Sequence, residues 1–167
     1  MNFTEFKLNA QILSGVKELG YETATPIQEK AIPSILAGLD VVGTAQTGTG
    51  KTAAFALPLL QRLMDGPRGQ LRGLILAPTR ELAEQIRQSI DRLAIRTGLR
   101  CTAIYGGANL VKQYQILRRG VDIVIACPGR LLDHINRGNI NLTQVEVLVL
   151  DEADHMLDLG FYKDIKE

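Results

Sequence analysis

The stretch Ala45-Gln46-Thr47-Gly48-Thr49-Gly50-Lys51-Thr52 decides the fold of this chain. It follows an apolar run at residues 40–45 that is typical of a buried strand, and it precedes residues 51–64, which we expect to be helical. A glycine-rich turn between a strand and a helix directs backbone N–H groups and the positive end of the helix dipole toward one point. That point suits a polyphosphate, with the Lys51 ammonium group on the terminal phosphates and the Thr52 hydroxyl on a magnesium ion. Taken alone, the octet is also compatible with a flexible turn that contains Gly-Lys-Thr by chance, because Ala45 stands where the general motif has glycine.

The composition is that of one ordinary globular domain. The chain has 167 residues and a net charge of +1, and it has no apolar run of about 18 residues that would predict a membrane span. No basic segment followed by an apolar one marks a secretory signal at its start. Cys101 and Cys127 lie far apart without neighbouring ligand residues, which favours small buried thiols in a reducing cytoplasm over a disulfide or a metal site.

The small net charge hides an asymmetry along the chain. Residues 62–100 contain eight arginines, no lysine and four acidic residues, whereas residues 141–167 contain seven acidic and two basic residues. Solvated helix faces would explain both segments. A phosphate-binding surface in the middle and an acidic metal site near the end would explain them as well.

Strand-like and helix-like segments alternate along the chain. The strand-like runs are 40–45, 72–77, 100–105, 121–126 and 145–150, and the helical patterns are 9–19, a segment from Pro26 to Gly38, 51–64, 79–96 and 109–118. This alternation predicts an α/β fold with a parallel sheet of at least five strands and helices on both faces. Ligands of such sheets bind at the carboxyl ends of the strands.

Every expected strand ends in polar, charged or glycine-rich residues. In chain order, the strands lead into the phosphate loop, Pro78-Thr79-Arg80, Gly106-Gly107, Cys127-Pro128-Gly129-Arg130 and Asp151-Glu152-Ala153-Asp154. Five such coincidences at one sheet edge favour a functional site over a purely structural explanation.

The acid pair at the end of the last strand completes the nucleotide chemistry. Asp151 can hold a magnesium ion through water, opposite Thr52, and Glu152 can orient and deprotonate the water that attacks the terminal phosphate. The alternative is that acidic residues gather there because the helix dipole favours them.

The remaining loops have features that suit a sugar-phosphate backbone. Thr79 caps a helix that begins near Arg80, Gly106-Gly107 permits close approach, and Gly129-Arg130 places a cation in the first turn of another helix. Internal salt bridges of Arg80 and Arg130 are the competing explanation.

At this point the motifs resemble the DEAD-box ATP-dependent RNA helicases, and their bacterial members in particular. Asp151-Glu152-Ala153-Asp154 spells that family's name, and the family's phosphate loop has alanine at the position of Ala45. The resemblance implies a RecA-like core, ATP and Mg²⁺ as cofactors, and RNA held by Pro78, Thr79, Arg80, Gly106, Gly107, Pro128, Gly129 and Arg130. It also implies that residues 20–28 recognise adenine: Gln28 would bond the base edge, Tyr21 would pack on the base with help from Phe3, and Thr25 belongs to the same segment.

Two departures from the family pattern matter. Cys127 stands where the family usually has threonine, which removes a hydroxyl from the expected RNA face. The chain also stops before the family's Ser-Ala-Thr strand and its second RecA-like domain. We expect residues 1–38 to form N-terminal helices with the adenine-recognition segment, and residues 39–167 to form a RecA-like core that is incomplete at its C-terminus. That strand would insert between the strands leading to Lys51 and Asp151. We therefore expect the chain either to close the gap between its own strands or to form a homodimer through the open edges.

The expected function is that of the ATP-binding core of an RNA helicase that couples ATP hydrolysis to RNA binding and duplex unwinding. The fragment itself should bind nucleotide, hydrolyse it slowly if at all, and unwind nothing. One rival is a non-enzymatic nucleotide- or RNA-binding or self-assembling module left by loss of the second domain. Another is a phosphate-loop kinase or DNA translocase.

Overall fold

The structure is a computed structural model that describes all residues from 1 to 167. It divides into two compact units: unit 1 comprises Met1–Gly66 and Ser89–Leu99, and unit 2 comprises Pro67–Gln88 and Arg100–Glu167. Helix α4 (Arg80–Leu93) contributes residues to both units. No helix is both long and apolar enough to cross a membrane.

Unit 1 is helical. It contains the 3-10 helix η1 (Phe3–Phe6) and the helices α1 (Ala10–Glu18), α2 (Pro26–Leu36) and α3 (Lys51–Met64). Asn9 caps α1 by accepting a hydrogen bond from the Gln11 N–H, and its own N–H donates to Gln61 Oε1 of α3 at 2.7 Å. A Cβ added at Gly15 would lie 2.3 Å from the Leu93 carbonyl oxygen, so α1 packs on residues 89–99 at a distance that only glycine allows.

Unit 2 is built around a four-stranded parallel sheet. Its strands are β1 (Gly73–Leu76), β2 (Cys101–Ile104), β3 (Ile123–Ala126) and β4 (Val147–Leu150), in the spatial order β2-β3-β1-β4. The central strands β1 and β3 are buried along their whole length, as the runs of branched apolar residues predicted. The helices of the unit are α5 (Leu110–Arg118), α6 (Pro128–Asn136), α7 (Ala153–Asp158) and α8 (Tyr162–Lys166), together with the first part of α4.

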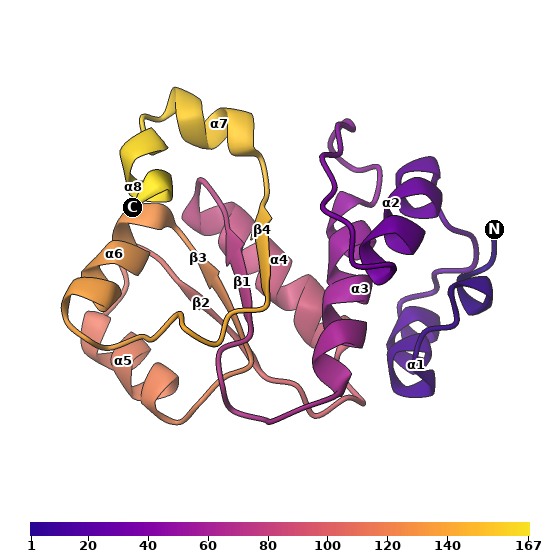
Figure 1. The fold of residues 1–167 in the computed structure, drawn as a ribbon, viewed down its shortest axis with the longest axis horizontal. Helices are drawn as coiled ribbons and strands as arrows, with labels where there is room; N and C mark the ends of the chain where they lie inside the picture. Colours follow the sequence, from indigo (N-terminus) through magenta and orange to yellow (C-terminus); the bar gives the residue numbers. More distant parts are fainter. The chain divides into compact units, whose positions relative to one another are not determined.

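The core of unit 2 lies between the sheet and the helices that Figure 1 shows gathered beside it, α5, α6 and α8. Leu74 and Leu76 of β1 share this core with Leu131 of α6 and Met156 of α7. Ile75 and Ile125 alternate with the residues that face this core and are also fully buried, so both faces of the central strands are covered. The expected parallel α/β arrangement is confirmed.

The expected strand at residues 40–45 is wrong, and the sheet has four strands rather than at least five. Residues 40–45 enter no strand ladder, and Val42 is 99% exposed. An apolar run becomes a strand only when a neighbouring strand accepts and donates its backbone hydrogen bonds, and this run has no such neighbour. In unit 2, β4 has a strand neighbour, β1, on one side only.

Neither cysteine forms a disulfide, and both are partly buried rather than buried as expected. Cys101 begins β2 and Cys127 precedes α6. Both positions lie at strand ends, where packing is less complete than at the centre of the sheet.

Candidate functional site

The phosphate loop of unit 1 has the backbone that its glycines predicted. Gly48 and Gly50 have φ angles of +81° and +87°, in the left-handed region that favours glycine, and α3 begins immediately afterwards at Lys51. Lys51 Nζ donates to the Ala45 carbonyl oxygen at 2.9 Å, and the Thr49 hydroxyl donates to the Gln46 carbonyl oxygen at 2.7 Å. The loop thus closes on itself in front of a helix of 14 residues, with the N–H groups of the first turn of α3 at its base.

Gln28 connects the segment before α2 to the phosphate loop. Its Nε2 donates to the Gly50 carbonyl oxygen at 3.0 Å, and its Oε1 accepts from the Thr25 N–H at 2.9 Å. The side chain is 4% exposed, so both ends of the amide are satisfied inside unit 1. A Cβ at Gly50 would lie 2.4 Å from Gln28 Nε2 and 3.3 Å from the Thr25 hydroxyl oxygen. The segment expected to recognise a base therefore contacts the segment expected to bind phosphate.

Two aromatic side chains lie next to each other near the start of the chain. The rings of Phe3 and Tyr21 stack with centroids 6.1 Å apart, and Phe6 packs edge-on against Phe3 at 5.9 Å. Phe3 is buried, whereas Tyr21 is 41% exposed. Phe3 thus packs in the core, and the Tyr21 ring has a surface left for a ligand. That the two rings assist in binding adenine stays a prediction.

The acid pair of unit 2 has an unusual backbone. Asp151 follows β4 directly, and its N–H donates to the Leu76 carbonyl oxygen at 3.0 Å, which extends the ladder between β1 and β4. Glu152 has φ +52° and ψ +50°, a left-handed conformation that costs a non-glycine residue about 1–2 kcal/mol. The Glu152 N–H donates to Asp151 Oδ1 at 3.1 Å, and Glu152 Oε2 lies 3.2 Å from His155 Nδ1. Strain of this kind at the carboxyl end of a strand is typical of functional sites.

The motifs that were expected to hold RNA converge within unit 2. They lie at the carboxyl ends of β1, β2 and β3, and parallel pairing brings these ends to one edge of the sheet. A Cβ at Gly107 would lie 3.9 Å from Arg80 Nη1, which places the segment after β1 beside the segment after β2. The Thr79 hydroxyl accepts from the Leu82 N–H at 3.2 Å and caps α4 as predicted.

The two arginines at this edge differ in their surroundings. The side chain of Arg80 is 58% exposed and forms an ion pair with its neighbour Glu81 at 3.2 Å. The backbone N–H of Glu81 and then the Arg80 guanidinium hold the pKa of Glu81 below its ordinary value. The side chain of Arg130 is 13% exposed, lies 3.5 Å from Asp133 Oδ2, and donates from Nη1 to the Ala108 carbonyl oxygen and to Gln113 Oε1. Internal contacts, the alternative explanation, therefore account for Arg130 far better than for Arg80.

Cys127 occupies the N-cap of α6, just before Pro128 and Gly129, without making a side-chain capping bond. Burial and, to a smaller extent, the carboxylate of Glu81 raise the pKa of its thiol to about 11. The group is thus neutral and unreactive at neutral pH, a half-buried apolar surface at the edge where a threonine would offer a hydroxyl.

Sequence reasoning missed the side chains behind this edge. Buried Gln113 and His134 and half-buried Asn139 form a chain of polar contacts beside Arg130. Gln113 could have been noticed because it is a polar residue on the inward face of an amphipathic helix. The partners could not have been found, because the contacts join residues up to 21 positions apart.

The structure brings the predicted residues together in two groups. In unit 1, Phe3 lies with Tyr21, and Thr25 and Gln28 lie with the phosphate loop. In unit 2, residues 78–80, 106–107 and 127–130 lie at one sheet edge, and Asp151-Glu152 follow the adjacent strand β4. That Lys51 and Asp151 share one metal-phosphate cluster stays a prediction.

Comparisons with known proteins agree with these motifs. The sequence profile of the DEAD/DEAH box helicases matches residues 25–167. The chain is 49% identical to the ATP-dependent RNA helicase CshA of Listeria monocytogenes and 46% identical to the DEAD-box ATP-dependent RNA helicase CshA of Bacillus cereus. Each alignment covers 98% of this chain and 31% of the relative, so the chain spans about a third of the length of these relatives.

A solved structure gives the same result for the fold. A DEAD box protein from the hyperthermophile Methanococcus jannaschii superimposes on this chain with a TM-score of 0.92 at 43% identity, over 99% of this chain and 45% of the other. The parallel sheet with its flanking helices is thus a RecA-like fold, as expected. With a matching profile over most of its length and relatives at nearly half identity, the chain belongs to the DEAD/DEAH box helicase family.

Proposed function

We propose that this chain supplies the ATP-binding core of an ATP-dependent RNA helicase. The observation that carries the proposal is the pair of hydrogen bonds from the Gln28 amide, which connect Thr25 to Gly50 at the N-terminus of α3. A protein that only needed a phosphate site would have no reason to couple the loop to a second recognition segment. We infer that Gln28 and Tyr21 take the adenine edge and face, and that binding ATP exchanges the bond of Gln28 to Gly50 for one to the base.

The phosphate loop suits a triphosphate with magnesium. Residues 45–52 offer backbone N–H groups at the positive end of α3, and Lys51 exchanges its bond to the Ala45 carbonyl oxygen for the terminal phosphates. Thr52 and Asp151 are hard oxygen donors, which fit Mg²⁺, and no cluster of three or more His, Cys, Asp or Glu side chains forms a cage that would suit another metal. When bound, Mg²⁺ neutralises charge on the phosphates.

The acid pair performs the proton chemistry in this proposal. Asp151 would hold the metal through water, and Glu152 would hold the attacking water by its carboxylate and accept its proton. The left-handed backbone of Glu152 supports this role, because strained backbone of this kind clusters at functional sites. Positioning and charge neutralisation, rather than covalent catalysis, supply most of the rate enhancement.

The sheet edge of unit 2 is the proposed RNA surface. Arg80, which is exposed, and the N–H groups at the start of α4 meet phosphates, and Gly106, Gly107 and Gly129 let the sugar-phosphate backbone approach closely. Contacts of this kind carry no base specificity, so RNA of any sequence is the expected partner. We further propose that a second RecA-like domain completes the RNA site. We also place the protein in the reducing cytoplasm, in keeping with two cysteines that form no disulfide.

A calorimetric titration tests the nucleotide assignment. The wild-type chain should bind ADP or ATP with Mg²⁺, and Lys51→Ala should abolish the heat of binding, whereas Lys30→Ala on α2 should not change it. Equal affinity of the Lys51→Ala and wild-type chains would refute the assignment of the phosphate loop.

Turnover is tested by supplying the C-terminal half of a related helicase. RNA-stimulated ATP hydrolysis that Glu152→Gln abolishes without changing ATP affinity would support the helicase. Self-association without nucleotide binding would instead support a non-enzymatic assembly module.

A further inference from the structure

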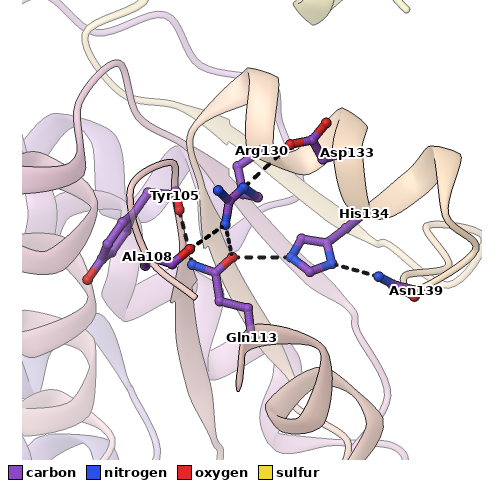
Figure 2. A network of polar contacts seen from close by, with 7 residues as sticks. All are labelled: Tyr105, Ala108, Gln113, Arg130, Asp133, His134 and Asn139. Atoms are coloured by element: carbon purple, nitrogen blue, oxygen red, sulfur yellow. Dashed lines mark hydrogen bonds and ion pairs between the residues drawn. The ribbon is translucent and has the colours of Figure 1, made fainter. Parts of the chain in front are cut away.

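The loop that contains Gly106 and Gly107 is held at both ends by side chains from two different helices. Gln113 Nε2 of α5 donates to the Tyr105 carbonyl oxygen at 3.1 Å, and Arg130 Nη1 of α6 donates to the Ala108 carbonyl oxygen at 3.1 Å. Figure 2 shows that these two side chains meet at the Gln113 Oε1 atom, which lies 2.9 Å from Arg130 Nη1. One amide group thus bonds to the start of the loop and to the residue that holds its end.

We propose that Gln113 is a positioning residue that holds the Gly106-Gly107 loop, directly and through the Arg130 guanidinium, in one arrangement for binding an RNA backbone. The proposal rests on the proposed function, because it gives that RNA surface a mechanical support. It assigns Arg130 to holding the loop rather than to gripping phosphate, since its Nη1 is engaged twice inside the protein.

The chemistry requires an amide at position 113. The group must donate to a carbonyl and accept from a guanidinium at the same time, and the side chain is 6% exposed, so water cannot replace either partner. A carboxylate would accept but not donate, and a thioether would do neither well. Gly107 has φ +79° and a freely accessible surface, so the loop has little packing of its own to keep its shape.

A histidine supports the accepting side of the amide. His134 Nε2 lies 3.2 Å from Gln113 Oε1, and Asn139 Nδ2 lies 3.2 Å from His134 Nδ1. An amide oxygen can only accept and an amide nitrogen can only donate, so the contacts specify a neutral imidazole with its proton on Nε2. The surroundings also favour the neutral form: burial, the Arg130 guanidinium and Arg137 lower the pKa of His134, and Asp133 opposes them. Each residue therefore donates a hydrogen bond to the next, from Asn139 to His134, from His134 to Gln113, and from Gln113 to the Tyr105 carbonyl oxygen of the loop.

Two variants separate the two halves of the amide. Gln113→Met removes both the donor and the acceptor, whereas Gln113→Glu keeps the acceptor for Arg130 and His134 and places an oxygen against the Tyr105 carbonyl. Gln115→Met is the matched control, because Gln115 lies on the same helix with an exposed side chain. If circular dichroism shows that Gln113→Met is unfolded, the measurements on Gln113→Glu alone decide the test.

The first measurement is NMR of the 167-residue chain without RNA. In both Gln113 variants the ¹⁵N order parameters of Gly106 and Gly107 should fall below about 0.6, while those of the α5 and α6 backbone stay near 0.85. The ¹⁵N chemical shifts of the His134 imidazole should keep the Nε2–H pattern in Gln113→Glu, which retains an accepting oxygen, and lose it in Gln113→Met, which does not. A loop that is equally ordered in the wild-type chain and in both folded variants would overturn the proposal, as would identical effects of Gln115→Met.

The second measurement is the fluorescence anisotropy of a labelled oligouridine at low salt. Loss of the loop's hydrogen bonds should weaken RNA binding about fivefold in both Gln113 variants, with Gln115→Met and the affinity for ADP unchanged. RNA affinity that stays unchanged although the loop is mobile would overturn the role of Gln113 in RNA binding. A mobile loop in the variants together with no RNA binding by the wild-type chain would uphold the support of the loop and overturn the proposed RNA surface instead.

Discussion

The contact between Gln28 and the phosphate loop predicts a steric conflict at Gly50. In Gly50→Ala the new Cβ would lie 2.4 Å from Gln28 Nε2, so the amide must move by about 1 Å and give up its 3.0 Å bond to the Gly50 carbonyl oxygen. That loss costs about 1–2 kcal/mol, because the groups left behind are buried. The φ angle of +87° costs an alanine about 1–2 kcal/mol more. The expected destabilisation is therefore about 2–4 kcal/mol, a large part of the stability of a typical domain.

Gly48→Ala provides the control within the same loop. Gly48 has a similar φ angle of +81°, but a Cβ there would meet no atom within 4 Å. Gly48→Ala should lower the free energy of unfolding only by the cost of the left-handed φ angle, about 1–2 kcal/mol. The difference between the two alanine variants isolates the contact with Gln28.

Urea unfolding followed by far-UV circular dichroism measures both changes, since the chain has no tryptophan. Adding Gln28→Ala to each variant completes the test: without the amide, Gly50→Ala should cost about as much as Gly48→Ala. A cost of Gly50→Ala that matches Gly48→Ala to within about 0.5 kcal/mol in the wild-type background would refute the coupling of the two segments.

Three further predictions concern unit 2. Burial is the first cause of the lowered pKa of His134, which keeps the imidazole neutral in the folded chain. The unfolded chain therefore binds more protons below about pH 6.5, and the folded chain loses stability as the pH falls. The urea midpoint should decrease when the pH is lowered from 7.5 to 5.5, and it should decrease less in His134→Gln. The pKa of Cys127 is raised from an ordinary 9.0 to about 11, so only a small fraction of the thiol is ionised at pH 8. In a Cys101→Ser background, the folded chain should therefore react with iodoacetamide at pH 8 about a hundredfold more slowly than the chain unfolded in urea. Equal rates in the two states would contradict the burial of Cys127. β4 has no strand neighbour on one side, and its Leu148 and Leu150 side chains are 57% and 41% exposed, so we expect concentration-dependent dimers in sedimentation velocity that Leu148→Lys weakens; a monomer at every concentration would count against this.

The sequence by itself determined the local features of this protein. The phosphate loop could be placed because glycine is needed at positive φ before a helix, and the four observed strands could be placed because branched apolar runs are typical of buried parallel strands. The acid pair and the edge motifs followed from the rule that parallel strands end at one edge. These inferences depend on properties of neighbouring residues, which the sequence states directly.

Only the tertiary structure decided which distant groups meet. Residues 40–45 have the pattern of a strand, yet without a ladder partner they form none. Gln28 bonds to Gly50, 22 residues away, and Arg130 turns inward to Ala108 and Gln113 although its position suited an exposed phosphate ligand equally well. A buried polar group must find a partner somewhere, but its chemistry does not say where, because the partner is chosen by the packing of elements that are remote in the chain.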